Sequence, residues 1–328
     1  MGRLTGEPGP AVERLASARR ALLTSHMSPD GDAVGSELAL AELARALGVE
    51  PVIVNRDPAP AGLDAMPGYG EVRLAAAVDG GLLDGIDLVV TLECPELSRA
   101  GIEGLDRRPI LNIDHHKGNA RYGEIDYLDD TAPAVGEMVW RMFRHAGVEP
   151  SAGAATAAFV ALSTDTGDFR YGNATPRAFE AAAEMVAAGA RPEQVSEWVH
   201  ERKTAGSVRL LGEALRTLEL LAGGRLAVMS VDPEAFRRAG AEPGDTDDLI
   251  DVPRSIAGVR VTVFLKQWEP DAVRVSLRSR GELDVRAIAA RFGGGGHTNA
   301  AGCTIPGGLE AARRAVVRLA LELVEEEG

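Results

Sequence analysis

Residues 110–116 read Ile-Leu-Asn-Ile-Asp-His-His, a short apolar run that ends in one carboxylate and two imidazoles. A short apolar run bounded by polar residues is typical of a buried strand. Ionisable side chains at the end of such a strand are costly to bury without a partner. Imidazole and carboxylate are the commonest protein ligands of first-row metals. This stretch therefore predicts a strand that ends at a cation site, with further ligands elsewhere in the chain.

Three more apolar runs are predicted to be strands, at residues 21–23, 52–54 and 87–92. Stretches with helical spacing lie between or after them, at residues 37–47, 136–145 and 152–162, and Gly35-Ser36 is predicted to open the first of these helices. Strands that alternate with helices indicate an α/β fold with a mostly parallel sheet flanked by helices.

The second part of the chain is predicted to be a separate, smaller α/β domain. Residues 177–221 are expected to be helical, and strands are expected at 226–231, 259–265 and 272–277, before a Gly-rich turn at Gly293 and a final helix. We therefore expect a catalytic domain at residues 1–201, a helical linker at 202–221 and a second domain at 222–328.

Composition narrows the class of protein. A chain of 328 residues is long enough for two domains. Its formal charge of −14 argues against a track for long nucleic acid, because such a track needs a basic surface. Cys94 and Cys303 are the only cysteines, so no disulfide framework or zinc knuckle is expected. No apolar run approaches the roughly 20 residues of a membrane helix, and the start lacks the apolar segment of a signal peptide. We expect a soluble, cytoplasmic protein.

Further candidate ligands follow the other predicted strands. The loop after residues 21–23 carries His26, Asp30 and Asp32, and Pro29 and Gly31 make it irregular. Taken singly, either aspartate is as well explained by helix capping. Because the carboxyl ends of parallel strands share one edge, we expect these side chains to meet the Asp-His-His stretch there.

Two more segments add carboxylates. Glu93 ends the run at 87–92, with Arg99 six residues further on, and Asp165 follows the apolar run at 152–162. Alone, Asp165 is a typical turn residue. Oxygen ligands mixed with imidazoles suit Mn²⁺, or Mg²⁺ with a weaker fit. With five or six ligands, two ions require a bridging carboxylate, and Glu93 is the candidate.

In the second domain, residues 293–302 read Gly-Gly-Gly-Gly-His-Thr-Asn-Ala-Ala-Gly. Consecutive glycines let backbone amides approach a phosphate or a base, so Gly294, Gly295, Gly296 and His297 are candidate substrate-binding residues. A flexible linker is the alternative. Arg278 follows a predicted strand and is a candidate for binding phosphate, although a surface salt bridge explains it nearly as well.

These motifs, in this order, resemble the DHH phosphoesterase superfamily, and specifically its nanoRNase branch of small bacterial oligoribonucleases that also dephosphorylate 3′-phosphoadenosine 5′-phosphate. The matching segments are residues 26–36, 114–116, 165–167 and 293–297, so the resemblance covers nearly the whole chain.

The resemblance implies a role for each candidate residue. His26 and Asp30 would hold one Mn²⁺ ion, while Asp32, His115 and Asp165 would hold a second. Glu93 would bridge them, although the family usually has Asp at this position. His116 would contact the scissile phosphate, Asp114 would orient the histidines, and the Gly-rich loop of a DHH-associated domain would hold the rest of the nucleotide in a cleft between domains. Arg99 is a further candidate catalytic group and Ser36 a further candidate for substrate binding.

The expected function is hydrolysis of very short oligoribonucleotides, of 3′-phosphoadenosine 5′-phosphate, or of both, by water that two Mn²⁺ ions activate, with Mg²⁺ or Co²⁺ as substitutes. Cleavage of cyclic dinucleotides such as c-di-AMP, or of linear dinucleotides, is the nearest alternative. A family II inorganic pyrophosphatase and a catalytically silent nucleotide-binding regulator are weaker ones. We expect a short RNA or nucleotide as the partner and no membrane, and we leave a homodimer open.

Overall fold

The computed structural model describes residues 3–78, 80–201, 203–246 and 249–325. The chain divides into two compact units, Met1–Arg202 and Lys203–Gly328. Each unit has its own sheet and its own hydrophobic core.

The first unit is built on a seven-stranded sheet in the order β1-β7-β6-β5-β2-β3-β4. Every neighbouring pair in this sheet is parallel. The strands are β1 (Arg3–Thr5), β2 (Arg20–Thr24), β3 (Glu50–Asn55), β4 (Arg73–Leu74), β5 (Leu88–Leu92), β6 (Ile110–Asp114) and β7 (Ile125–Leu128). The predicted α/β class with a mostly parallel sheet is confirmed, and the structure adds the short strands β1, β4 and β7, of which β1 and β4 are the edges.

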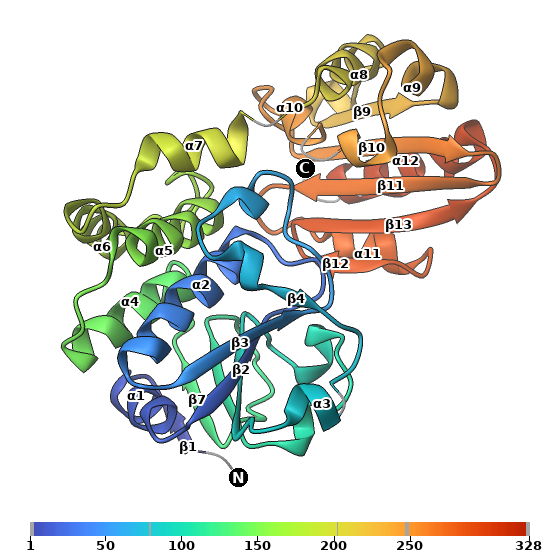
Figure 1. Cartoon of the computed structure of the whole chain (residues 1–328). Coiled ribbons are helices and arrows are strands. Elements are labelled where there is room, and N and C mark those ends of the chain that lie inside the picture. The colour runs from blue at the N-terminus through green and yellow to red at the C-terminus, as the bar shows by residue number, and fades with distance from the viewer. Residues whose placement is uncertain (1–2, 79, 202, 247–248, 326–328) are drawn as a thin grey trace. The chain divides into compact units, whose positions relative to one another are not determined.

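Helices cover both faces of this sheet, with α3 on the opposite side of the strands from α2 and α4 (Figure 1). The alternation of side chains along a strand sends Leu23 to one core and Leu22 to the other. The helices are α1 (Gly9–Ala16), α2 (Gly31–Ala46), α3 (Gly80–Leu83), α4 (Val135–Ala146), α5 (Ala152–Asp165), α6 (Pro176–Ala187) and α7 (Pro192–His200).

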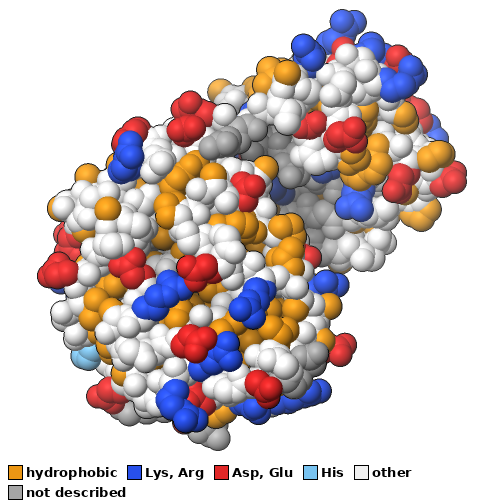
Figure 2. Space-filling model, viewed as in Figure 1, with side chains coloured by type: hydrophobic (Ala, Val, Ile, Leu, Met, Phe, Trp, Pro, Cys, Tyr) orange, Lys and Arg blue, Asp and Glu red, His pale blue; other side chains and the backbone are white. Residues whose placement is uncertain are grey.

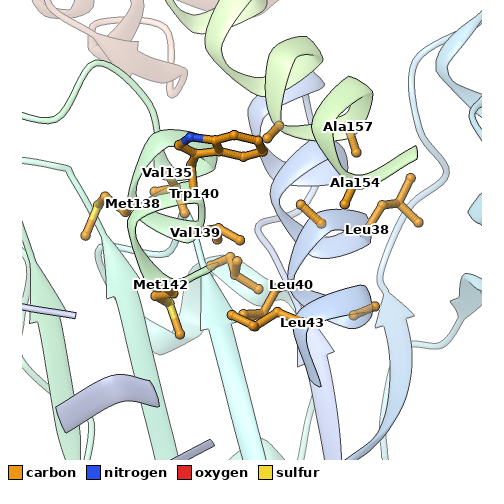
Figure 3. Close-up of a cluster of buried hydrophobic side chains, with 14 of the residues drawn as sticks. Leu38, Leu40, Leu43, Val135, Met138, Val139, Trp140, Met142, Ala154 and Ala157 are labelled. Carbon is orange, nitrogen blue, oxygen red and sulfur yellow. The ribbon is translucent and has the colours of Figure 1, made fainter. Parts of the chain in front are cut away.

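The larger core lies where α2, α4 and α5 meet. Figure 3 shows Leu40 and Leu43 of α2 beside Val139 and Met142 of α4, with Ala154 and Ala157 of α5 on the other flank of α2. Gly35 makes the close approach of α2 and α5 possible, because a Cβ there would lie 2.3 Å from the carbonyl oxygen of Ala157. The contact fixes both helices where each carries a candidate ligand.

Two details of the predicted elements are wrong. Helix α2 begins at Gly31 rather than at Gly35, because Asp30 caps it by accepting a hydrogen bond from the Ala33 amide. Gly35-Ser36 therefore lies inside the helix, and its amides do not face an anion. Asp165, predicted to follow the helical run at 152–162, is itself the last residue of α5.

The second unit is built on a six-stranded sheet in the order β12-β13-β11-β10-β9-β8, in which only β9 and β10 are parallel. Its strands are β8 (Glu219–Leu221), β9 (Leu226–Val231), β10 (Val261–Glu269), β11 (Ala272–Ser279), β12 (Gly295–His297) and β13 (Ala300–Pro306). Its helices are α8 (Ala205–Arg216), α9 (Pro233–Ala239), α10 (Asp251–Arg254), α11 (Val285–Ala290) and α12 (Leu309–Glu325).

Helix α8 occupies most of the segment for which a linker is predicted, and it packs on β9 and α9 of the second unit. The helical prediction for 177–221 is wrong at its end, where residues 219–221 form β8 and pair with β9. The predicted division of the chain into a catalytic domain, a linker and a second domain stays a prediction.

Two surface properties bear on function. None of the helices in the described ranges combines the length and apolar character that a membrane span needs. On the face that Figure 2 shows, acidic and basic side chains are interspersed, and the described residues form no continuous basic track there.

Candidate metal centre

The candidate ligands gather at the carboxyl edge of the first sheet. Strands β2, β5 and β6 are neighbours in parallel register, so the residues that follow them emerge side by side. His26 follows β2 after one residue, Glu93 follows β5 directly, and His115 follows β6 directly. For the candidate ligands that directly follow strands, this arrangement produces the predicted meeting at one edge of the sheet.

Their side-chain atoms form two groups that share His115. Glu93, His115 and His116 make one group, and Asp32, His115 and Asp165 make the other, with the ligand atoms of each group within 4.8 Å of one another. His115 Nε2 lies 3.0 Å from Glu93 Oε1 and 3.9 Å from Asp165 Oδ2. Two groups of three donors that meet at one imidazole have the composition of a divalent-metal site.

The rings of three histidines are held through Nδ1. In His26 and His115 this nitrogen lies 2.8 Å and 3.0 Å from the carbonyl oxygens of Met27 and Ala132. A carbonyl only accepts, so Nδ1 carries the proton and the neutral ring offers Nε2 as a ligand atom. His116 Nδ1 lies 2.8 Å from Asp114 Oδ1. Metal-binding histidines are commonly oriented in this way.

Asp32 is held by the backbone of a different helix. Its Oδ2 accepts from the Val135 amide at 2.7 Å, and its Oδ1 accepts from the Gly136 amide at 2.9 Å. The carboxylate thus caps the first turn of α4 although it belongs to α2. Asp30, the N-cap of α2, has its Oδ1 3.9 Å from His26 Nε2. Asp32 Oδ1 also accepts from Ser36, so both of its lone pairs are used. Capping and metal binding are still compatible for both aspartates, because Asp32 Oδ2 and the oxygens of Asp30 each keep a lone pair.

Glu93 is in an environment that suits a carboxylate facing a cation. Its side chain is 3% exposed, and Oε1 has no hydrogen bond of good geometry, although His115 Nε2 is 3.0 Å away. Burial, and then the charge of Asp32, raise the pKa of Glu93 well above its usual value. Its backbone is left-handed, with φ +60°, a strained conformation that typically occurs at functional sites.

The pKa values of Asp165 and His115, the neighbours of Glu93, also fit a site for a cation. Burial, followed by the charge of Asp32, raises the pKa of Asp165 to about 7. Burial would lower the pKa of His115, but its contact with Glu93 and the charge of that carboxylate outweigh burial and raise the pKa to about 11. The carboxylates repel one another without a cation between them, so a divalent ion fits this donor set.

The Asp114 carboxylate is buried next to His116 and is not one of the candidate metal ligands. Its two oxygens accept from His116 Nδ1 and from Asn119 Nδ2, the latter at 2.6 Å. Burial alone would raise the pKa of Asp114, but the hydrogen bond and the charge of His116 outweigh it and hold the pKa below its usual value. This geometry supports an orienting role for Asp114, which stays a prediction.

Two asparagines that the sequence does not single out hold this arrangement. Asn119 donates to Asp114 and to the Cys94 carbonyl, and Asn173 donates to Asp165 Oδ2 at 3.1 Å. Neither stands in a motif that marks it. The only available signal is the position of Asn119 in the turn after Asp-His-His.

The remaining predicted residues are placed as follows. Arg99 lies in a short 3-10 helix, Leu97–Ala100, where its carbonyl accepts from the Met27 amide at 2.7 Å and its side chain is exposed. Ser36 is buried and donates to Asp32 Oδ1, so it stands behind that carboxylate instead of on the surface. A direct contact of Ser36 with substrate is at odds with this burial.

In the second unit, the candidate substrate-binding residues Arg278 and His297 lie on the two strands that flank β13. Arg278 pairs with Ala300, and Ala300 pairs with His297 on its other side. The side chain of His297 lies outside the described residues. A Cβ on Gly294 or Gly296 would meet backbone oxygens of β13 at 2.2 Å and 2.4 Å, so packing alone requires these two glycines. A Cβ on Gly295 would meet nothing within 4 Å, which leaves its backbone open to a ligand.

Comparison with known proteins agrees with this geometry. Residues 20–164 match the family described as "DHH family, N-terminal domain", and residues 223–326 match the "DHHA1 domain". A protein of Thermus thermophilus named "Bifunctional oligoribonuclease and PAP phosphatase NrnA" is 37% identical over 93% of this chain and 89% of its own length. The chain belongs to the DHH family.

Two further relatives support the assignment. The Bacillus subtilis protein with the same name is 26% identical over 89% of this chain and 91% of its own length. Among solved structures, an exopolyphosphatase-related protein of Bacteroides fragilis matches with a TM-score of 0.87 and 25% identity, covering 96% of this chain and 95% of that one. The predicted resemblance to the DHH family and its nanoRNase branch is confirmed.

Proposed function

We propose that this DHH-family protein is a metal-dependent phosphoesterase that hydrolyses very short oligoribonucleotides and removes the 3′-phosphate of 3′-phosphoadenosine 5′-phosphate. The observation that carries the proposal is the sharing of His115 by two groups of metal-ligand atoms at one sheet edge. The named activities of its Thermus and Bacillus relatives supply the substrate class.

In this proposal two Mn²⁺ ions are the cofactor, with Mg²⁺ or Co²⁺ as substitutes. Asp32, His115 and Asp165 would hold one ion, His26 and Asp30 would hold the other, and Glu93 would contribute its carboxylate to both. One of the two groups in the structure links Glu93 to His115 and His116, the other shares only His115 with it, and the bridge to His26 and Asp30 is inferred. Bound divalent ions would supply Lewis acidity, which lowers the pKa of water and offsets charge on the phosphoryl oxygens.

The protein's own residues position the phosphate and keep the site ordered. Asp114 fixes the Nδ1 proton of His116, so His116 presents Nε2 toward the scissile phosphate. Burial of Glu93 and Asp32 limits the access of water and strengthens their interaction with any bound cation. The exposed Arg99, fixed through its carbonyl to the His26 loop, contributes a positive charge for the same phosphate.

Nucleotide recognition is assigned to the second unit. The free space beside Gly295, and the neighbouring positions of Arg278, Ala300 and His297 on β11, β13 and β12, make this part of the sheet suitable for a phosphate or a base. The acidic chain, and the lack of a continuous basic track among the described residues on the face that Figure 2 shows, favour short substrates over long strands. We place the enzyme in the cytoplasm.

A cyclic dinucleotide phosphodiesterase is the second candidate. A protein of Geobacillus thermodenitrificans named "Cyclic-di-AMP phosphodiesterase GdpP" is 24% identical over 88% of this chain, which spans 45% of that protein's length. This similarity is weaker than that to the Thermus protein, so cyclic dinucleotides are the alternative substrate.

The test is a panel of end-labelled di- to hexanucleotides, 3′-phosphoadenosine 5′-phosphate, c-di-AMP and pyrophosphate, each with Mn²⁺ and with Mg²⁺. We expect the fastest release of mononucleotides from the shortest RNAs and release of phosphate from 3′-phosphoadenosine 5′-phosphate. A preference for c-di-AMP or pyrophosphate would replace the proposed substrate. No turnover of any compound by metal-loaded protein would indicate a nucleotide-binding regulator.

A further inference from the structure

A hollow of about 630 Å³ opens beside the metal centre within the first unit. It lies past the carboxyl ends of β6 and β7, and its lining includes His116, Lys117, Arg121, Asp129, Arg141 and Arg177. Its volume falls within the roughly 300–1,000 Å³ of small-ligand sites. His116 is common to the hollow and to the metal-ligand groups, so the two spaces adjoin.

The back wall of the hollow is a fixed cluster of charges. Arg141 and Arg177 each donate to Asp129 Oδ2 at 2.9 Å, and Arg177 also pairs with Glu137. Burial would raise the pKa of Asp129, but Thr131 and Arg177 donate hydrogen bonds to it and hold the pKa below its usual value. These arginines are therefore committed to structural pairs, and they give the wall a definite shape.

The rim of the hollow carries two further cations, Lys117 and Arg121. Both side chains are exposed, and neither has a hydrogen bond or an ion pair with another side chain in the described part of the protein. The lining as a whole carries four cationic side chains, Lys117, Arg121, Arg141 and Arg177, and three carboxylates, Glu7, Asp129 and Asp130, so it is weakly positive in a chain with a formal charge of −14. Such an excess favours an anionic occupant.

The loop that carries these cations is built onto the metal centre. Arg121 has a left-handed backbone with φ +56°, a conformation that is unfavourable in a residue with a side chain. It is held there because its amide donates to Asn119 Oδ1 at 2.8 Å. The same Asn119 donates to Asp114, the partner of His116. One side chain thus fixes both the orientation of His116 and the position of Arg121.

We propose that this hollow is a subsite for the phosphodiester next to the scissile phosphate, and that Lys117 and Arg121 contact it. The inference rests on the proposed function, because it assumes that His116 faces the scissile phosphate. When the scissile phosphate of a nucleotide chain faces His116, the next phosphate of that chain lies in the hollow, close to Lys117 and Arg121. The subsite would then favour substrates with a phosphate beyond the cleaved bond.

The substrates for the test differ by one group at a time. The 5′-phosphorylated adenosine trinucleotide has a phosphodiester beyond the first scissile one, and the 5′-phosphorylated dinucleotide lacks it. A dinucleotide with an added 3′-phosphate restores the anion without the third nucleoside. 3′-Phosphoadenosine 5′-phosphate has no group beyond the phosphate that is cleaved.

The variant is the double substitution Lys117→Gln and Arg121→Gln, and the matched control is Arg73→Gln. Arg73 is an exposed arginine of β4, at the opposite end of the sheet from β1 and β7. For the double variant we expect KM to rise about tenfold for the trinucleotide, because losing charge-assisted contacts of this kind costs at least that factor. We expect a similar rise for the 3′-phosphorylated dinucleotide and less than about a twofold rise for the plain dinucleotide. The control should match the wild type on all substrates.

Two results would overturn the subsite. KM would rise equally for the trinucleotide, the dinucleotide and 3′-phosphoadenosine 5′-phosphate if the cations acted only on the scissile phosphate. KM would change for none of them if the hollow held no substrate. Failure of the proposed function is a separate result, because the wild-type protein itself would then turn over none of these compounds.

Discussion

His115 Nε2 and Glu93 Oε1 lie 3.0 Å apart at the carboxyl edge of the sheet without forming a hydrogen bond of good geometry. Two ligand atoms that point toward the same space, one of them on a carboxylate that is 3% exposed, are arranged to share a cation. The pKa of Glu93 is raised well above its usual value, first by burial and then by the charge of Asp32.

Glu93→Gln keeps the size of the side chain and removes its charge. We expect bound Mn²⁺ to fall from about two ions per chain toward one, because an amide is a poor bridge between cations. The metal-free variant should be at least as stable as the wild type, since a buried charge is replaced by a neutral group. Elemental analysis and thermal unfolding measure the two effects. Glu96→Gln, at an exposed position three residues away, is the control. An unchanged metal count in Glu93→Gln would remove Glu93 from the site.

Asn119→Ala removes the donor that holds Asp114. We expect kcat to fall about 10–100-fold while bound metal stays constant, because Asn119 orients His116 through Asp114 and contacts no candidate metal ligand directly. Asn173→Ala is the contrasting variant. Asn173 donates to Asp165, so its loss should weaken metal affinity. If Asn119→Ala lost metal and Asn173→Ala did not, the assignment of these two residues would be reversed.

The substitution Glu37→Gln tests whether the pKa of a buried carboxyl on α2 is raised. Burial raises the pKa of Glu37 to about 8, although Asn55 Nδ2 donates to it at 2.8 Å. Between its usual value of about 4.5 and about 8, the folded protein binds a proton that the unfolded chain has lost, so this group makes stability fall as pH rises.

The variant Glu37→Gln has no carboxyl group at this position, so it does not lose stability in this way as the pH rises. Its Tm relative to the wild type should therefore increase from pH 4.5 to pH 8 and then level off, by about 4 °C or more, since 1 kcal/mol shifts Tm by about 2–4 °C in a domain of this size. Thermal unfolding of the metal-free proteins across this pH range measures it. A difference in Tm that stays constant with pH would show that Glu37 is ionised in the folded state.

Gly295→Ala tests the Gly-rich loop without disturbing its packing. A Cβ at this position would meet nothing within 4 Å, so the fold should tolerate it, whereas a ligand against the backbone would be displaced. We expect KM for the dinucleotide to rise about tenfold, a loss of about 1.4 kcal/mol of binding free energy, with kcat and Tm nearly unchanged. Gly212→Ala, at an equally open position in α8, is the control. Equal effects of the two substitutions would show that the loop does not bind substrate.

The sequence predicted the parts of the fold that follow from local pattern. The run at 226–231 is a strand with the predicted bounds, and the strands that carry Glu93 and His115 lie side by side at the sheet edge as expected. Apolar periodicity sufficed there because each run is buried on both faces of a sheet.

The parts that failed depend on tertiary contacts. The start of α2 was placed four residues late because Asp30 serves both as a helix cap and as a candidate ligand. Asp165 reaches the centre from the end of α5, and a strand-edge argument cannot foresee that geometry. The roles of Asn119 and Asn173 follow from partners that are brought close only by folding.

We expect hydrolysis to depend on divalent metal held at His115 and its neighbours. The most direct measurement is the initial rate of dinucleotide hydrolysis by chelator-treated protein as Mn²⁺ is added in known equivalents. We predict no hydrolysis without metal and a rate that saturates near two equivalents per chain. Full activity of the metal-free protein, or a rate indifferent to added metal, would contradict the account.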